Sequence, residues 1–308
     1  MEIILVLYFS ILIGIGVAAS KKVNNVSDYY AGGKKLNYWI AALSARATGE
    51  SGWLLLGVTG MGAVMGFSAF WIVLGEVLGV FLSWHFMAEK FKTLTDNYKS
   101  ITVPDFLHSH FNSKTNTIRI IAATALSAFV VIYVSAQIDI TGKAFESFLG
   151  YNYYFGILIG FGIVVAYIFS GGFLAVAWSD LFQGSIMFLA LLVLPITAYL
   201  QLPNKMTFLQ GLKDIDPALV NIWGDGGFTF MNFLSVIGLL SIGIGFLGSP
   251  QVYVRFIAIK NTQEIKKGKI VAVIYTLVSS SCAVMIGMIG RFMFTTNSQN
   301  PETVLGPA

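Results

Sequence analysis

The chain has 308 residues, of which 56% are hydrophobic and only 11% charged, and it carries a net charge of +4. This composition excludes an ordinary soluble globular domain, in which about a quarter of residues are charged, and it indicates an integral membrane protein surrounded by lipid. The basic excess does not indicate a nucleic-acid partner, because the lysines and arginines gather in loops between apolar runs. The single cysteine, Cys282, excludes an internal disulfide and is expected to be a core residue.

Long apolar runs recur along the whole chain. A helix needs about 20 such residues to cross a bilayer, and its backbone must be hydrogen-bonded internally there. We therefore predict eight membrane spans, at approximately 2–19, 38–60, 66–88, 118–142, 153–171, 180–200, 229–248 and 270–292. No basic residue precedes the first run, so it is expected to be a retained helix rather than a cleaved signal peptide.

The loops differ in charge. Three alternate loops, 20–37, 89–117 and 249–269, hold most of the lysines and arginines. The positive-inside rule makes these loops cytoplasmic and places the N-terminus outside the plasma membrane. The loop at 201–228 is predicted to be a short external cap. After eight spans the chain ends outside without a polar tail, so we expect it to be the N-terminal part of a longer protein.

The second span contains the interruption "ARATGESGW" at 45–53. Arg46 and Glu50 are four residues apart, so they could simply pair on one helix face. Gly49 and Gly52 weaken the helix between them. The alternative is a broken helix, in which the freed carbonyls of 47–50 bind a cation and the freed N–H groups meet an anionic group.

The seventh span contains a second interruption, "IGIGFLGSPQ". Gly243, Gly245 and Gly248 precede Pro250, a pattern typical of a kink or hinge. The same glycines match the dinucleotide motif G-x-G-x-x-G, but no strand precedes them, which excludes that function. Two interrupted spans separated by four continuous ones are typical of a transporter with repeated halves.

Other polar residues lie in apolar spans. Glu76 belongs to a G-x-x-x-G packing motif and could pair with Arg46. Gln137 and Asp139 are about 200° apart on a helix, so they cannot both face one cavity. Asp180 could cap the start of the sixth span.

Signals for an enzyme are missing. The histidines, His85, His108 and His110, have no cysteine or paired carboxylate at a metal-ligand spacing. The sequence has no phosphate loop and no nucleophile elbow. We expect neither an enzyme nor a cofactor, and no metal other than a coupling sodium ion.

Five stretches resemble the sodium:solute symporter family, most closely its sodium/proline branch. They are "SDYYAGGKKL" (27–36), "ALSARATGESGWLLLGVTGM" (42–61), "TVPDFLHSHF" (102–111), "AYIFSGGFLAVAWSDLFQGSIM" (166–187) and "GFLGSPQVYVRF" (245–256). The resemblance implies an all-α polytopic membrane protein with a leucine-transporter-like inverted-repeat fold. One transmembrane domain would then cover 1–308, with a leading helix and loop at 1–37, the first five-helix repeat at 38–200 and the start of the second at 229–308.

The resemblance further implies sodium-coupled import of a small organic solute, most simply an amino acid such as proline or a related zwitterion. Sodium would be bound by the backbone carbonyls of Ala47 and Glu50, with Asp180 nearby. The candidate solute-binding residues are Gly49, Ser51, Trp53, Tyr133, Gln137 and Phe246.

Some residues depart from the family pattern. Gly49 stands where proline transporters have an aspartate, and Ile242 and Phe246 stand where they have tryptophan and tyrosine. Asp139 stands where an apolar residue is usual, so it is a candidate counter-charge or protonatable group. The solute therefore stays open, and the alternatives are a sugar, sialic-acid or carboxylate symporter, the membrane domain of a sensor histidine kinase, or a passive channel. Proton coupling through Glu50 or Asp139 is a further hypothesis.

Overall fold

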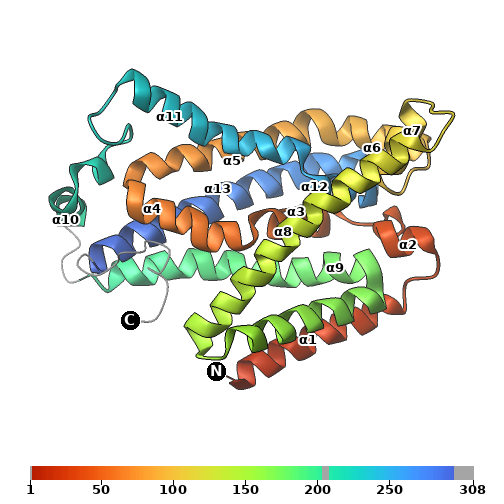
Figure 1. Cartoon of the computed structure of the whole chain (residues 1–308), viewed down its shortest axis with the longest axis horizontal. Helices are drawn as coiled ribbons and strands as arrows, with labels where there is room; N and C mark the ends of the chain where they lie inside the picture. Colours follow the sequence, from red (N-terminus) through yellow and green to blue (C-terminus); the bar gives the residue numbers. More distant parts are fainter. Residues whose placement is uncertain (1, 203–207, 295–308) are drawn as a thin grey trace.

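The computed structural model describes residues 2–202 and 208–294, so residues 295–308 of the predicted domain lie outside the described residues. The described part is helical (Figure 1). Its β-type backbone pairing consists of an isolated bridge between Leu36 and Ile259. Within this part, six continuous helical runs are long and apolar enough to cross a membrane. Two of these runs, 60 and 48 residues long, reverse direction at Gly66 and Gly172, which accounts for the eight predicted spans.

The elements follow the predicted spans closely. The first four spans contain α1 (Glu2–Ser20), α3 (Tyr38–Gly52), η2 (Trp53–Val58), α4 (Thr59–Met65), α5 (Phe70–Leu82), η4 (Ser83–Met87), α6 (Ala88–Asn97) and α8 (Thr117–Leu149). The last four contain α9 (Tyr153–Leu200), α11 (Phe230–Ser241), η7 (Ile242–Gly248), α12 (Pro250–Ala258) and α13 (Thr262–Met293). α9 holds both the fifth and the sixth span, which form a hairpin around Gly172 (Figure 1).

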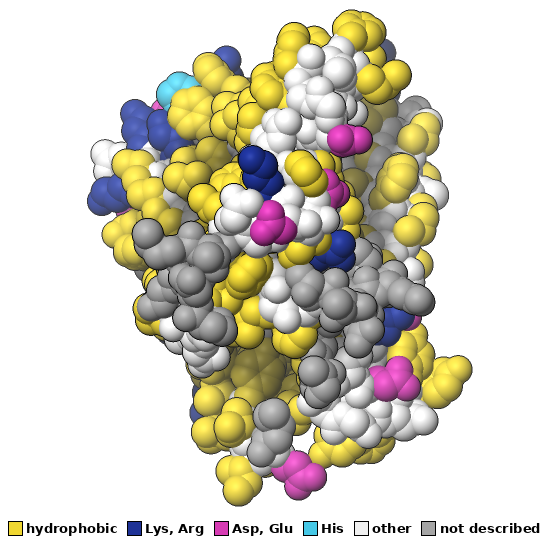
Figure 2. Space-filling view, turned by 90° about the vertical axis from the view of Figure 1, so that its left-hand side faces the viewer, with side chains coloured by type: hydrophobic (Ala, Val, Ile, Leu, Met, Phe, Trp, Pro, Cys, Tyr) yellow, Lys and Arg dark blue, Asp and Glu magenta, His cyan; other side chains and the backbone are white. Residues whose placement is uncertain are grey.

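The connections are more ordered than the sequence predicted. They contain α2 (Val26–Ala31), η1 (Gly32–Lys34), η3 (Gly66–Ala69), α7 (Val103–His110), α10 (Phe208–Ile215) and η6 (Pro217–Val220). Asparagines begin several helices, because the side chains of Asn37, Asn152 and Asn261 accept hydrogen bonds from N–H groups of the first turn. At the end of the molecule that carries α10, acidic and basic side chains are both scattered among hydrophobic ones (Figure 2).

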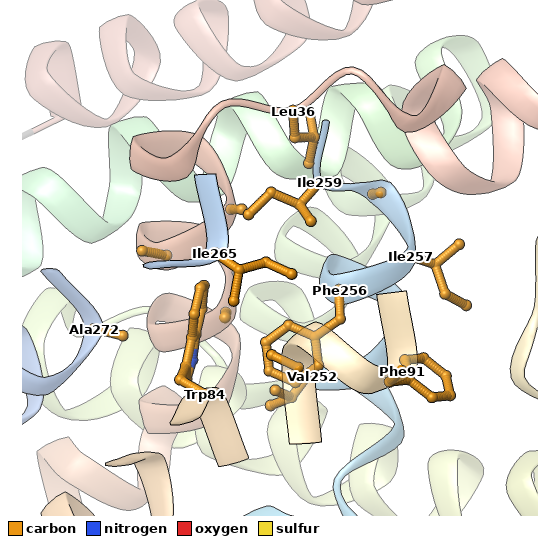
Figure 3. Packing of buried hydrophobic residues seen from close by; sticks show 14 of the residues in the cluster. Leu36, Trp84, Phe91, Val252, Phe256, Ile257, Ile259, Ile265 and Ala272 are labelled. Carbon is orange, nitrogen blue, oxygen red and sulfur yellow. The ribbon is translucent and has the colours of Figure 1, made fainter. Parts of the chain in front are cut away.

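At the opposite end, buried hydrophobic residues join four parts of the chain. Leu36, Trp84, Phe256, Ile259 and Ile265 pack together there, so that the segment before α3, the α5–α6 region, α12 and α13 share one core (Figure 3). The backbone of Leu36 also exchanges hydrogen bonds with Ala258 and Lys260. This core fixes the two interrupted spans beside each other.

Glycines allow the closest helix contacts. A Cβ atom on Gly75 would meet the backbone of Leu240, and one on Gly79 would collide with the carbonyl oxygen of Gly243. The G-x-x-x-G motif around Glu76 is therefore a packing face, as predicted, and its partner is the interrupted seventh span.

Candidate functional site

The second span is broken, as the glycines at 49 and 52 suggested. The break itself is at Ser51, whose φ of 41° and ψ of −152° are not helical. Gly49 has a different use, since a Cβ atom there would lie 3.1 Å from the Phe246 ring. The glycine thus lets the ring of the seventh span approach the backbone of the second.

Side chains of α8 satisfy backbone groups around this break. The Tyr133 hydroxyl donates to the Thr48 carbonyl at 3.0 Å. The Gly52 N–H donates to Gln137 Oε1 at 3.3 Å. The Glu50 carbonyl, which the sequence suggested as free, accepts the N–H of Trp53. The break is therefore held open by a neighbouring helix.

The seventh span is also interrupted. The 3₁₀ segment η7 ends at Gly248, the next residue, Ser249, is extended with a φ of −72° and a ψ of 109°, and Pro250 then begins α12. The Tyr253 hydroxyl donates to the Leu247 carbonyl at 2.6 Å. Gly243, Gly245 and Gly248 all keep a negative φ. Their predicted hinge role stays a prediction.

A cavity of about 340 Å³ lies between the two breaks. Its lining contains all six residues that the sequence analysis selected for the solute, and it adds three from the seventh span: Gly49, Ser51, Trp53, Tyr133, Gln137 and Phe246, with Ile242, Gly245 and Ser249. None of these described lining residues carries a charge. The cavity has aromatic walls and a few hydroxyl and amide groups.

Arg46 and Glu50 form a buried ion pair behind this cavity. Their side chains are 2% and 1% exposed and lie 2.9 Å apart. The Ser279 hydroxyl of α13 also donates to Glu50, at 2.8 Å. The Arg46 guanidinium lies over the Phe246 ring, 5.1 Å from its centre. This stretch therefore contains both the helical pair and a break, while the predicted binding of a cation and an anionic group by its backbone stays a prediction.

Glu76 does not pair with Arg46. One of its oxygens accepts a hydrogen bond from Trp53 Nε1 at 2.9 Å, and the other accepts from the Ser280 hydroxyl at 2.6 Å. Burial without a cation is tolerated here because both oxygens receive donors. Glu76 thereby orients Trp53, which lines the cavity.

Asp180 lies within α9 and is not a helix cap, because the helix resumes directly after Gly172. Its Oδ2 accepts from Arg255 Nη2 at 2.8 Å and from the Ser44 hydroxyl at 2.6 Å. Four residues further on, a Cβ atom on Gly184 would lie 3.2 Å from the Cβ of Ala47. Ala47 and Asp180 thus belong to one interface between α3 and α9, whereas the Glu50 side chain contacts α13.

Asp139 is not among the residues that line the cavity. It is 44% exposed, accepts a hydrogen bond from the Tyr153 hydroxyl at 2.7 Å and pairs with Lys143 at 2.9 Å. Gln137 faces the cavity instead, which confirms that these two residues point in different directions. The idea of Asp139 as a counter-charge for the solute is therefore wrong for this cavity.

A model of the sodium:solute symporter family matches residues 29–306. The chain belongs to the sodium:solute symporter family. It is 36% identical over 294 residues to the high-affinity proline transporter PutP of Bacillus subtilis (strain 168), covering 94% of this chain and 61% of the relative. It is 34% identical over 307 residues to the sodium/proline symporter of Staphylococcus aureus (strain JH9), covering 98% of this chain and 59% of the relative.

A solved structure of a Na⁺-coupled sialic acid symporter, in a substrate-bound outward-open state, has the same fold. Its TM-score is 0.83 at 18% identity, and the match covers 99% of this chain and 65% of that one. This symporter family chain therefore has the expected leucine-transporter-like, multi-pass membrane fold, and its family is one of transporters rather than enzymes. It spans about three fifths of the length of the curated relatives it matches.

Sequence reasoning missed several residues around this candidate site. Arg255, Ser279 and Ser280 contact α3, α5 or α9 from positions between 75 and 229 residues away in the chain. Hydroxyls in apolar helices give little signal, since most of them bond their own backbone. Of these three residues, only Arg255 could have been selected from the sequence, because it is a basic residue in the largely apolar stretch "QVYVRF".

A larger cavity of about 660 Å³ adjoins the first and shares Ser51 and Gln137 with it. Aliphatic side chains of η2, α8 and α9 form most of its wall. It offers few groups that could orient a polar solute.

Proposed function

We propose that this protein is a sodium-coupled symporter that imports a small zwitterionic amino acid, such as proline or a close relative, across the plasma membrane. Membership of the sodium:solute symporter family supports the coupling ion, and two relatives named as proline transporters support the substrate class. The observation that carries the proposal is the uncharged cavity between two broken helices.

The cavity suits a small zwitterion for two reasons. It is an open space of about 340 Å³, which is large enough for a solute of one amino acid. Its described lining carries no charge, so it would favour a solute whose own charges cancel. The solute carboxylate would replace Gln137 Oε1 as the acceptor of the Gly52 N–H, and its remainder would contact Tyr133 and Phe246.

Sodium would be bound beside the first break. Backbone carbonyls of Ala47 and Glu50, together with the Asp180 carboxylate, are the hard oxygen donors that an alkali cation prefers. Inward movement of one sodium ion gains about 2.3 kcal/mol per 100 mV of membrane potential. Gly243, Gly245, Gly248 and Pro250 would serve as the hinge for the change between outward and inward access.

The same-family sugar or sialic-acid carrier is the second candidate for the substrate. The fold similarity to a sialic acid symporter does not favour this substrate, because a similarity at 18% sequence identity shows a shared fold and not a shared substrate. The apolar residues Ile242 and Phe246 in the lining also fit a polyhydroxylated solute poorly.

The test is uptake of a labelled solute panel, proline included, into proteoliposomes that contain the full-length protein. We expect an imposed inward sodium gradient to drive accumulation of one amino-acid-like solute, and a potassium gradient of the same size to drive none. Accumulation of a sugar or sialic acid instead would show that the substrate is not an amino acid. Solute binding without accumulation of any solute would favour a sensor and contradict the proposal.

A further inference from the structure

Glu76 is a buried carboxylate behind the solute cavity, and its charge is not balanced by the described residues. It is 1% exposed. Both of its oxygens accept hydrogen bonds, but the donors, Trp53 Nε1 and the Ser280 hydroxyl, are neutral. None of the ion pairs in the described part of the chain includes Glu76, and Arg46 is already paired with Glu50. Hydrogen bonds therefore satisfy the oxygens of Glu76, while its negative charge still lacks a counter-charge.

Trp53 connects this charge to the solute cavity. Its indole N–H donates to Glu76 Oε1 at 2.9 Å, and the residue is part of the cavity lining. Tryptophan attracts cations to its ring face more strongly than tyrosine or phenylalanine does. A carboxylate that accepts the indole N–H polarises the ring further in the same sense. Trp53 and Glu76 together therefore give this wall of the cavity a negative potential.

The other aromatic residues of the lining are less suited to a cation. The Phe246 ring already has the Arg46 guanidinium over it, 5.1 Å from its centre. The Tyr133 hydroxyl donates to the Thr48 carbonyl, a neutral acceptor. In contrast, none of the lysine and arginine contacts with rings in the described residues involves Trp53. Of the three aromatic rings in the lining, Trp53 therefore suits a positively charged group best.

The position of Trp53 suits the amine of an α-amino acid. The solute carboxylate is proposed to accept the Gly52 N–H, which now donates to Gln137 at 3.3 Å. The carboxylate and the amine of an α-amino acid are attached to the same carbon atom, so the groups that bind them have to be neighbours. Gly52 and Trp53 are consecutive residues directly after the break at Ser51. One end of the first break thus offers a place for both charges of the solute.

We propose that Glu76 determines specificity for an amine in the solute: the amine lies over the Trp53 ring, and Glu76 supplies the counter-charge through the indole. This inference rests on the proposed function, because it takes a zwitterion as the solute of the cavity. Glu76 acts through Trp53 and is therefore a positioning residue. Neither its packing motif nor the family resemblance supplied this role.

The test compares two solutes of the same shape on the purified full-length protein, by titration in the presence of sodium. The probes are L-proline and the acid in which an ether oxygen replaces the ring nitrogen. The wild-type protein should bind proline at least about tenfold more tightly than this amine-free acid.

Glu76→Gln removes the charge and keeps an oxygen that accepts the Trp53 N–H. The preference for proline should therefore fall about fivefold, because proline binds more weakly and the amine-free acid does not. Glu89→Gln is the matched control, since it neutralises an exposed carboxylate that lies 4.0 Å from Lys266. It should keep the wild-type preference.

The ratio of the two affinities separates this role from a merely structural one. A packing defect at Glu76 would weaken both solutes equally, and an unchanged ratio would overturn the inference. Trp53→Phe covers the case in which Glu76→Gln does not fold, because it keeps an aromatic ring and removes the indole N–H. This variant should also lower the preference for proline about fivefold.

The remaining outcomes distinguish the inference from the proposed function. Equal binding of proline and the amine-free acid by the wild-type protein would overturn the role of Glu76 and leave sodium-driven uptake intact. A wild-type protein that binds neither proline nor another amino acid would overturn the proposed function, and the inference with it.

Discussion

The two breaks that border the cavity are held in different ways. At the first break, a non-glycine residue, Ser51, adopts the irregular conformation, and α8 supplies Tyr133 and Gln137 to the freed backbone. At the second break, the segment holds itself, because Tyr253 donates to Leu247 six residues earlier. Among the described residues, hydrogen bonds from α8, a helix that also lines the cavity, thus hold the backbone of the first break.

This difference suggests that the two breaks have different roles. A solute between the breaks would contact the very side chains that hold the first one, so binding there should alter its geometry. The second break has its own internal support, which would let η7 and α12 keep their structure if they moved during transport. The buried pair of Arg46 and Glu50 joins the two, because Arg46 also lies over Phe246 of the second break.

The largest expected effect on stability comes from breaking the Arg46–Glu50 ion pair. Arg46→Met leaves Glu50 buried without its counter-charge, which should lower the free energy of unfolding by about 3–5 kcal/mol. Thermal unfolding in detergent measures this loss. The double variant Arg46→Met, Glu50→Leu replaces the pair with apolar side chains and should recover most of it. Equal losses of unfolding free energy in the single and double variants would show that the ion pair does not stabilise the contact between the two breaks.

Gly79→Ala tests how the second break is positioned. The added methyl would collide with the Gly243 carbonyl, and such overpacking costs about 1–3 kcal/mol. Gly238→Ala on α11 is the matched control, because a Cβ atom there meets nothing within 4 Å. We expect a lower melting temperature for Gly79→Ala only. Similar melting temperatures for the two variants would mean that the position of η7 does not depend on its contact with Gly79.

Two tyrosine variants compare the breaks directly. Tyr133→Phe and Tyr253→Phe each remove one hydroxyl from a backbone carbonyl, a loss of about 1 kcal/mol. Only Tyr133 lines the cavity, so only Tyr133→Phe should weaken solute binding, by about fivefold. Titration of solute into each purified variant decides the matter. Equal weakening in both would remove the distinction between the breaks.

The smallest effect on stability is expected for Gly248→Ala. Its φ is negative and a Cβ atom there meets nothing within 4 Å, so unfolding should change by no more than about 0.5 kcal/mol. If Gly248 is a hinge, the uptake rate should nevertheless fall while solute affinity stays the same. An unchanged uptake rate would remove Gly248 from the hinge.

Much of this site could be predicted because its signals are local. Charge and glycine inside the second span revealed the first break, glycines before a proline revealed the second, and residues of both breaks line one cavity. The exact position of the first break could not be read, since contacts from α8 decide it rather than the glycines. The possible capping role of Asp180 is wrong because the sixth span was predicted to start at residue 180, whereas the helix resumes directly after Gly172 and continues through Asp180. Arg255 and Ser279 reach their partners only through the fold.

The most direct test of the account is whether one solute contacts both breaks. In a background with Cys282 replaced by Ser, single cysteines at Ser51 and at Gly245 would be alkylated with a small thiol reagent, with Asp139→Cys as the control outside the cavity. We predict that sodium together with the transported solute slows alkylation at both positions and leaves the control unchanged. Protection at only one break, or at neither, would contradict a solute site between them.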